Sequence, residues 1–416
     1  MSAATVLAML DAEAMRDAIA SLPACADVAV GSGELAGLWV KPGRYFNAHY
    51  RFLGRDGREI RASSFLVDAQ RAERILQSAR AHTCATRGDL TCPACTTARV
   101  GEDRIVQAFP WDYRLPTLGR CLDAKRVRRA TEGLPKIDAA VVRAYRPGMR
   151  CQIEYRADGQ RGNSGMFGKV AVEQRGEGYT FRTHRTLAAA LASSTRSIRV
   201  PAALAYVESL RLMLVEGVDG TSVHDLVDAG ARPITEVAAA AVALAAIHAL
   251  ESVVEDRCHG VAEEQDLVGQ WVALCRDLFP DLAPTLDECL RVLAETAAAP
   301  VPPGATVHRD FYDKQVLCLD DAAPAVIDLD TAARGDREID VANFCAHLRF
   351  RALQHGREPL YAELEDAFLG AYPATLDRHR LDWYRRATLV RLACNYALRP
   401  RWRHVAPRAL ALVLEA

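Results

Sequence analysis

The sequence lacks both long apolar runs and an excess of basic residues. Its longest apolar stretch, from Val237 to Ile247, is too short to cross a bilayer and ends at His248. The 52 Lys and Arg residues are balanced by 53 Asp and Glu residues, which gives a formal net charge of −1. Nucleic-acid-binding proteins usually carry a basic excess. We therefore expect neither a membrane nor a nucleic acid as a partner.

The first residues also lack the features of a secretory leader. The segment from Met1 to Ala20 has no basic start and carries acids where a leader would be apolar. The 12 cysteines are scattered along the chain, unlike those of a small disulfide-rich domain. We expect a cytoplasmic protein in which most cysteines are reduced and act as small buried apolar residues. The sequence indicates no oligomeric state.

Lysine is scarce, because only five of the 52 basic residues are lysines. The other basic residues are arginines, so the chain uses arginine wherever either side chain suffices. Lysine and arginine differ in shape and in the distribution of their charge. A lysine at a chemically demanding position is therefore more informative here than in an average protein.

The composition is that of a globular protein, with 416 residues of which 50% are apolar and 25% charged. This length predicts two or three domains. Hydrophobic periodicity predicts a strand-rich first half and a mostly helical second half. The expected strands are 38–53, 59–67, 167–174, 211–216 and the block 306–330, and the expected helices of the first half are 1–30, 69–80 and 181–192.

Two segments of the strand-rich half resemble each other. Residues 41–58 and 146–160 both begin with a basic residue followed by Pro-Gly, and their tyrosines Tyr50 and Tyr155 are 105 residues apart. One interpretation is an internal duplication of a β-hairpin. The alternative is coincidence, because Pro-Gly turns before amphipathic strands are common.

The segment 306–344 carries the residues best suited to catalysis. An apolar lead-in ends near Asp310, and two short strands joined by a turn end at Asp328. A tight hairpin brings its ends together, so these two carboxylates should converge. Carboxylates and the amide of Gln315 can hold Mg²⁺, which prefers oxygen ligands. A carboxylate that binds no metal can accept a proton from an attacking hydroxyl. Phosphoryl transfer uses both kinds of group, the metal ligands and the proton acceptor.

This segment resembles the catalytic core of the aminoglycoside phosphotransferase and choline kinase-like family, which are small-molecule kinases of protein-kinase-like fold. Their His-x-Asp-x4-Asn loop, Ile-Asp block and Gly-Asp-x3-Asp stretch correspond to residues 308–315, 327–330 and 335–340. The resemblance implies that Asp310 is the catalytic base and that Asp328 and Gln315 bind the metal. It implies that Asp340 supports the loop from the following helix. It also implies ATP and Mg²⁺ as cofactors and a small-molecule hydroxyl as the acceptor.

The resemblance further implies an α+β, bilobal protein-kinase-like fold, with a small β-rich N-lobe and a large helical C-lobe. An α/β cap-like domain is expected before it. The expected parts are the cap at 1–137, the N-lobe and hinge at 138–218, and the C-lobe at 219–416, with the catalytic loop at 308–317 and the metal-binding segment at 327–330. Capped maltokinase-like sugar kinases show some likeness, because they also use Gln at the position of Gln315.

Four further residues receive roles from the resemblance. Lys169 falls on the third strand of the N-lobe, where the family keeps the lysine that binds the α- and β-phosphates of ATP. The backbone from Glu216 to Val218 corresponds to the hinge that binds the adenine edge. Lys314, inside the catalytic loop, either neutralises the transferring phosphoryl group or points into water.

Two departures from the family pattern leave the activity open. The helix after Lys169 has no acid to pair with that lysine, unless Glu173 or Glu177 substitutes. The turn expected to cover the phosphates, 146–150, has one glycine where a nucleotide-binding loop has several. The alternative to a kinase is therefore a nucleotide-binding pseudokinase that acts as a regulator or scaffold without turnover.

The acceptor is expected to be a sugar, an aminoglycoside or an amino alcohol. The segment after Asp328 is too short for the activation segment of protein kinases, which argues against a protein substrate. A sugar-like hydroxyl is preferred, because aromatic faces suit sugar rings and the helical half contains several. These aromatic residues are Trp383, Tyr384, Tyr396 and Trp402. The alternative is that they belong to the core.

His82, Cys84, Cys92 and Cys95 form a second candidate site. The spacing of Cys92 and Cys95 lets two thiolates share one tetrahedral ion, so structural zinc is one interpretation. The alternative is a loop with free thiols, because the usual second Cys-x2-Cys pair is missing.

The N-terminal region, residues 1–137, is expected to be a duplicated β-lobe without nucleotide chemistry. The strand that would match the strand of Lys169 runs from Ser64 to Val67 and has no lysine. The expected role of this region is to rigidify the small lobe or to narrow access to the substrate.

Overall fold

The computed structural model describes residues 3–83, 90–131, 133–157, 165–172, 176, 178–194, 197–250, 254, 257–299, 304–320 and 323–415. The chain divides into two units. The first unit contains Met1–Gln160, Gly165–Gly178 and Leu204–Leu214, and the second contains Arg161–Ser164, Tyr179–Ala203 and Val215–Ala416. Within the described residues, no helix combines the length and the apolar character needed to cross a bilayer.

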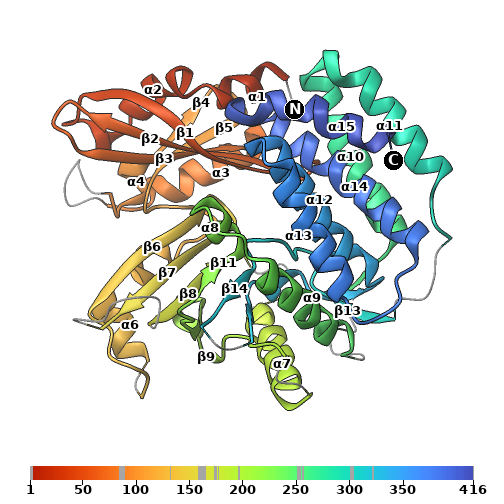
Figure 1. Ribbon diagram of the computed structural model, residues 1–416. Helices are drawn as coiled ribbons and strands as arrows, with labels where there is room; N and C mark the ends of the chain where they lie inside the picture. The colour runs from red at the N-terminus through yellow and green to blue at the C-terminus, as the bar shows by residue number, and fades with distance from the viewer. Residues whose placement is uncertain are drawn as a thin grey trace. The chain divides into compact units, whose positions relative to one another are not determined.

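The first unit begins with short helices and a five-stranded sheet (Figure 1). The helices are α1 (Ala3–Leu10), α2 (Ala12–Ala20), η1 (Pro23–Cys25), α3 (Ala69–Arg80) and α4 (Pro93–Thr96). The strands are β1 (Val30–Lys41), β2 (Tyr45–Gly54), β3 (Glu59–Leu66), β4 (Thr97–Val100) and β5 (Arg104–Ala108), in the order β1-β2-β3-β5-β4. The helix predicted over 1–30 is wrong in its extent, because Asp11 caps α2 and ends the first helix before it.

A second five-stranded sheet follows in the same order, β6-β7-β8-β10-β9. Its elements are α5 (Leu118–Cys121), α6 (Ala124–Ala130), β6 (Ala139–Arg146), β7 (Arg150–Arg156), β8 (Met166–Ala171), β9 (Ala203–Val207), η2 (Glu208–Leu210) and β10 (Leu212–Glu216). In both sheets a hairpin and a third strand are followed by a helix, α3 or α7 (Tyr179–Ser194), before the last two strands. The predicted repeat of the hairpin is therefore confirmed in topology.

The repeat also holds in register. Lys41 pairs with Tyr45 across the first hairpin, and Arg146 pairs with Arg150 across the second, at the same offset of 105 residues. The residue of β3 that pairs with Asn47 is Phe65, and the residue of β8 at the equivalent pairing position is Lys169. The first sheet thus has a buried phenylalanine where the second has its lysine.

The similarity between the two five-stranded sheets extends to the helices that precede each sheet. Tyr50 and Tyr155 each donate a hydrogen bond of 2.8 Å to a main-chain carbonyl at the end of a preceding helix. In each case an aspartate two residues later, Asp11 or Asp123, caps the next helix. Both aspartates stand in the sequence Leu-Asp-Ala. These positions lie outside the segments 41–58 and 146–160, so the comparison of those two segments did not include them.

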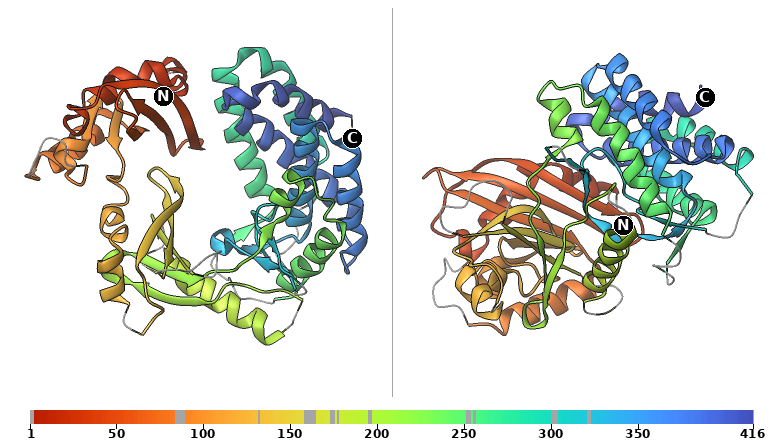
Figure 2. Two further views of the ribbon diagram at one scale, coloured as in Figure 1. Left: turned by 60° about the vertical axis from the view of Figure 1, so that its left-hand side comes forward. Right: turned by 60° about the horizontal axis from the view of Figure 1, so that its bottom comes forward.

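The second unit is mostly helical, and its helices pack against one another (Figure 2). Its helices after α7 are α8 (Val223–Asp228), α9 (Ile234–His248), α10 (Val261–Leu278), η3 (Pro280–Leu282), α11 (Ala283–Glu295), η4 (Leu329–Thr331), α12 (Glu338–His355), α13 (Glu358–Ala371), α14 (Arg378–Ala397), η5 (Pro400–Val405) and α15 (Ala406–Leu414). Its strands are β11 (Thr221–Ser222), β12 (Cys258–His259), β13 (Ala305–Val307), β14 (Val316–Cys318), β15 (Ala325–Val326) and β16 (Ala333–Gly335). They form two small sheets, β11-β14-β15 and β12-β16-β13.

Candidate active site

The hairpin predicted between Asp310 and Asp328 is present. Strand β14 pairs with β15 in antiparallel fashion, with Val316 opposite Val326. At the open end of this hairpin the amide of Ile327 donates to the carbonyl of Gln315 at 3.0 Å. The backbone before Asp328 is therefore fixed next to the end of the loop that contains Asp310.

His308 links the two segments a second time. Its Nε2 lies 3.0 Å from the carbonyl of Ile327, and its Nδ1 lies 3.3 Å from the amide of Asp310. The Nδ1 accepts from that amide, so the ring carries its proton on Nε2 and donates it to Ile327. Arg309 and Asp328 both have positive φ, 67° and 65°, which is uncommon outside glycine. Such backbone is typical of functional sites.

Asp340 supports the catalytic loop, as predicted. Its carboxylate accepts from the amides of His308 and Arg309 at 2.6 Å each, and it lies 3.0 Å from Nε2 of His248 on α9. Burial raises the pKa of Asp340, but the hydrogen bond and charge of His248 and the loop amide outweigh it, so this pKa is below its usual value. The ionised carboxylate therefore joins α12, α9 and the loop.

The far end of the loop is held by a second buried carboxylate, which the sequence analysis missed. Asp313 Oδ2 lies 3.1 Å from His224 Nδ1 and accepts from Arg351 at 3.2 Å. Burial raises the pKa of Asp313, but Arg351 and His224 outweigh it, so this pKa is well below its usual value. The local sequence gives no signal for this role, because its partners lie 89 and 38 residues away.

Lys314 and Gln315 follow the buried Asp313 directly in the chain. Gln315 is 5% exposed, and its main-chain carbonyl accepts from the amide of Ile327 at 3.0 Å. The oxygen donors of Asp328 and Gln315 suit Mg²⁺. Within the described residues, no group of three or more His, Cys, Asp or Glu side chains could hold a metal ion. The side chain of Lys314 is exposed overall. Partial desolvation of its ammonium group, followed by the charge of Arg351, nevertheless lowers its pKa.

The residues assigned to nucleotide binding lie on regular elements. Lys169 is on β8 of the first unit, paired with Gln152. Glu216 ends β10, where its amide donates to Ala202 at 2.9 Å, and Val218 follows as a buried residue. Helix α7 contains no acid, and both candidate substitutes, Glu173 and Glu177, lie outside the described residues.

The turn 146–150 is held by groups that sequence reasoning did not identify. Asp112 Oδ2 accepts from the amide of Gly148 at 2.6 Å and from the hydroxyl of Tyr145 at 2.9 Å. The side-chain amide of Asn47 donates to the carbonyl of Pro147 at 2.7 Å. Asn47 on β2 and Asp112 after β5 therefore hold the turn that is predicted to cover the phosphates.

The cysteine cluster is described only in part, because Cys84 lies outside the described residues. His82 Nδ1 lies 2.9 Å from the carbonyl of Ser78, Cys92 is disulfide-bonded, and Cys95 is a buried free thiol. A disulfide sulfur is not a thiolate ligand, and zinc binding by the four residues stays a prediction. Elsewhere, cysteines are mostly free and buried, as predicted.

Two of the aromatic residues considered for the acceptor belong to the core. Trp383 and Tyr384 are 1% and 0% exposed, Trp383 donates to the carbonyl of Leu293, and Tyr384 donates to Asp336. Tyr396 and Trp402 are partly exposed. Within the catalytic loop, Tyr312 stacks on His347 with ring centres 4.4 Å apart.

Comparisons with known proteins show the family and the fold. The phosphotransferase enzyme family matches residues 176–384, which is half of the chain. A thermostable mutant of aminoglycoside phosphotransferase APH(4)-Ia, in its apo form, is 17% identical with a TM-score of 0.51, over 69% of this chain and 98% of that chain. Spectinomycin phosphotransferase APH(9)-Ia, solved with ADP and spectinomycin, is 13% identical with a TM-score of 0.50, over 70% of this chain and 94% of that chain. A comparison with curated proteins finds no match.

The fold and the buttressed loop define a protein-kinase-like small-molecule kinase. The chain belongs to the phosphotransferase enzyme family, as the sequence predicts. The solved structures confirm the fold class, and at their low identity they carry no statement about the acceptor.

Proposed function

We propose that this protein transfers the γ-phosphate of ATP to a hydroxyl of a small molecule, with Asp310 as the base. The observation that carries the proposal is the double fixation of the catalytic loop. Asp340 holds its main chain, and His308 joins it to the residue before Asp328. A base that is fixed in position can accept the proton of the acceptor hydroxyl as that oxygen attacks.

The other residues of the site receive roles that suit their chemistry. Asp328 and Gln315 would hold Mg²⁺, which neutralises charge on the phosphates when bound. Lys169 would bind the α- and β-phosphates, and the backbone from Glu216 to Val218 would bind the adenine edge. Lys314 would place positive charge near the transferred group.

The acceptor is proposed to be a sugar, an aminoglycoside or an amino alcohol. An assay of ATP consumption with a panel of these three classes tests the function, with stoichiometric phosphorylated product as the expected result. The absence of an acid from α7 favours a second candidate, a nucleotide-binding regulator without turnover. Tight ATP binding without transfer to any member of the panel would support that regulator and count against the kinase.

A further inference from the structure

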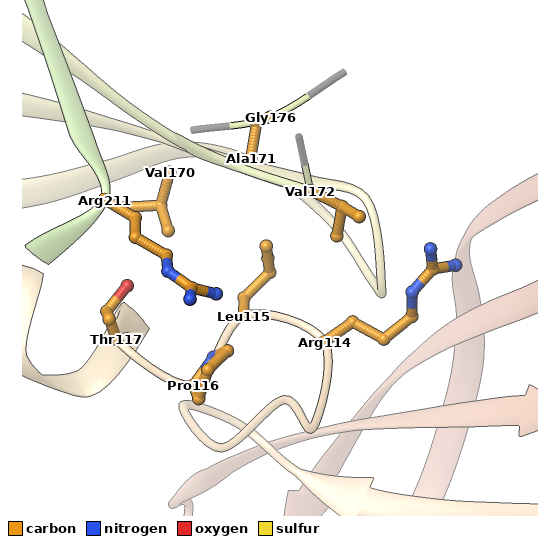
Figure 3. A pocket seen from close by; sticks show the side chains of 9 residues that line it. All are labelled: Arg114, Leu115, Pro116, Thr117, Val170, Ala171, Val172, Gly176 and Arg211. Carbon is orange, nitrogen blue, oxygen red and sulfur yellow. The ribbon is translucent and has the colours of Figure 1, made fainter. Parts of the chain in front are cut away.

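The two units differ in what their described residues leave for a further role. In the first unit a pocket lies between β8 and the segment before α5, where Val170 and Leu115 line the same space (Figure 3). Val172 and Gly176 line it on either side of the segment 173–175, which lies outside the described residues, so no ligand is assigned to it. In the second unit a chain of buried hydrogen bonds ends at the catalytic loop.

Tyr372 begins this chain of hydrogen bonds at the end of α13. Pro373 follows it, and a residue before proline avoids the helical conformation. Tyr372 accordingly has extended backbone, with φ −68° and ψ 118°, and is the C-cap residue of the helix. It is 7% exposed, and its hydroxyl lies 2.7 Å from Nδ1 of His248, the last residue of α9. The helices α9 and α13 pack against each other, which holds the two side chains together.

The direction of these hydrogen bonds follows from the charge of Asp340. Its carboxylate is ionised and can only accept, so Nε2 of His248, 3.0 Å away, carries a proton and donates it. The other nitrogen of a neutral imidazole has a lone pair, so Nδ1 accepts from the hydroxyl of Tyr372. Burial raises the pKa of Tyr372 to about 12, which keeps that hydroxyl protonated at neutral pH.

We propose that Tyr372 and His248 are positioning residues for phosphoryl transfer, and that they act on the loop of Asp310 through Asp340. The hydroxyl of Tyr372 selects the tautomer of His248 that carries its proton on Nε2. That proton fixes the carboxylate of Asp340, whose oxygens accept from two loop amides at 2.6 Å each. The ends of α9 and α13 thus hold the catalytic loop. The effect on turnover rests on the proposed function, whereas the effect on the loop does not.

Loss of the tyrosine hydroxyl should loosen the loop and leave the fold intact. Without it the two neutral tautomers of His248 become closer in energy, and in the second tautomer Nε2 presents a lone pair to the ionised Asp340. The two groups then repel each other, and the carboxylate can turn away from the loop amides. The strand before the loop keeps a separate link to the end of α9, because the hydroxyl of Thr306 donates to the carbonyl of Leu250 at 2.8 Å.

Tyr372→Phe in the full chain removes only the hydroxyl and tests the proposal. Hydrogen exchange of the amides of His308 and Arg309 should become about fivefold faster, because the carboxylate that accepts from them is less fixed. The kcat should fall about tenfold while the KM for ATP stays within about twofold. A ¹⁵N NMR spectrum of the ring should show His248 protonated on Nε2 in the wild type and a mixture of both tautomers in the variant.

Tyr50→Phe is the matched control, because Tyr50 is also buried and donates a hydrogen bond of 2.8 Å to the carbonyl of Met9 in the first unit. It should lower thermal stability to a similar degree and leave kcat and the exchange of the loop amides unchanged. Action through His248 predicts that Tyr372→Phe adds no further loss of kcat to His248→Leu.

Amide exchange and the ring spectrum are measured without turnover. A wild type that phosphorylates no acceptor would therefore count against the proposed function, while these two measurements still decide how the loop is held. Wild-type exchange rates with His248 protonated on Nε2 in Tyr372→Phe would overturn the proposal. Equal changes in Tyr50→Phe, faster exchange at an unchanged kcat, or an additive loss of kcat in the double variant would overturn it as well.

Discussion

Among single residues, Asp340 joins the catalytic loop to helix α9. It accepts from two loop amides and contacts His248. Asp340→Asn removes the charge and replaces one acceptor oxygen by a donor, which then faces a main-chain amide or the ring of His248. We expect the free energy of unfolding to fall by about 2–4 kcal/mol.

The same substitution should lower kcat while leaving the KM for ATP within about twofold, because Asp340 positions the loop and is not proposed to contact nucleotide. Steady-state kinetics and urea unfolding check both effects. Asp366→Asn, at an exposed aspartate of the neighbouring α13, is the matched control and should change neither quantity. An Asp340→Asn enzyme with wild-type kcat would show that the support of the loop by Asp340 has no part in turnover.

His49 gives a pH dependence to the first unit. Burial, followed by the charge of Arg61, lowers its pKa to about 4, against 6.5 in the unfolded chain. The folded protein keeps His49 neutral while the unfolded chain takes up a proton below pH 6.5. Stability is therefore lost as the pH falls from about 6.5 to about 4, by at most about 3 kcal/mol.

Urea unfolding between pH 7 and pH 4 measures this loss. His49→Gln keeps an acceptor for the hydroxyl of Ser63, which lies 2.9 Å from Nδ1 of His49, and should reduce the pH slope. His379→Gln, at an exposed histidine, should retain the full slope. Equal slopes in the two variants would contradict this assignment.

At the scale of elements, the two repeated hairpins offer a matched pair of glycines. Gly43 and Gly148 have φ 69° and 67° in equivalent turns. A Cβ at Gly43 would meet nothing within 4 Å among the described residues, whereas a Cβ at Gly148 would lie 2.9 Å from Asn47 Nδ2 and 3.1 Å from the Phe65 ring. Gly43→Ala should therefore cost only the backbone strain of about 1–2 kcal/mol.

Gly148→Ala should cost more and should also weaken ATP binding, because it disturbs the turn that Asn47 and Asp112 hold. Thermal unfolding and equilibrium ATP binding of both variants check this prediction. Equal losses of ATP affinity in both variants, or in neither, would show that the held turn does not contribute to nucleotide binding.

The sequence predicted those parts of the site that local patterns determine. The strand pattern after Asp310 and the turn before Ala325 determine the hairpin, so the pairing of Val316 with Val326 followed from short-range information. Asp112 and Asn47 could not be found in this way, since their partners in the turn lie 36 and 100 residues away. The same limit applies to Trp383, whose aromatic ring could not be assigned to a site or to the core before packing was known.

At the scale of the whole molecule, the N-terminal region supplies core to the second sheet. Five residues of the predicted cap, 1–137, belong to the core cluster of the second sheet: Leu115, Leu118, Cys121, Val127 and Ile137. A chain that begins at residue 138 would expose that apolar face. We expect a 138–416 chain to be insoluble.

Expression of 138–416 beside 112–416 checks this prediction, because the longer chain keeps these core residues. The longer chain should be the more soluble of the two. A 138–416 protein that is soluble, monomeric and fully active would show that the N-terminal region is an independent appendage.

Asp310 is the proposed base of an ATP-dependent transfer to a small-molecule hydroxyl. Its most direct test compares phosphoryl transfer and ATP affinity in the wild type, in Asp310→Asn, and in Asp320→Asn at an exposed aspartate of the same segment. General base catalysis contributes about 10²–10⁴-fold, so turnover in Asp310→Asn should fall by that factor while its ATP affinity stays nearly unchanged. Asp320→Asn should match the wild type in both measurements. Transfer by Asp310→Asn at the wild-type rate would contradict the account.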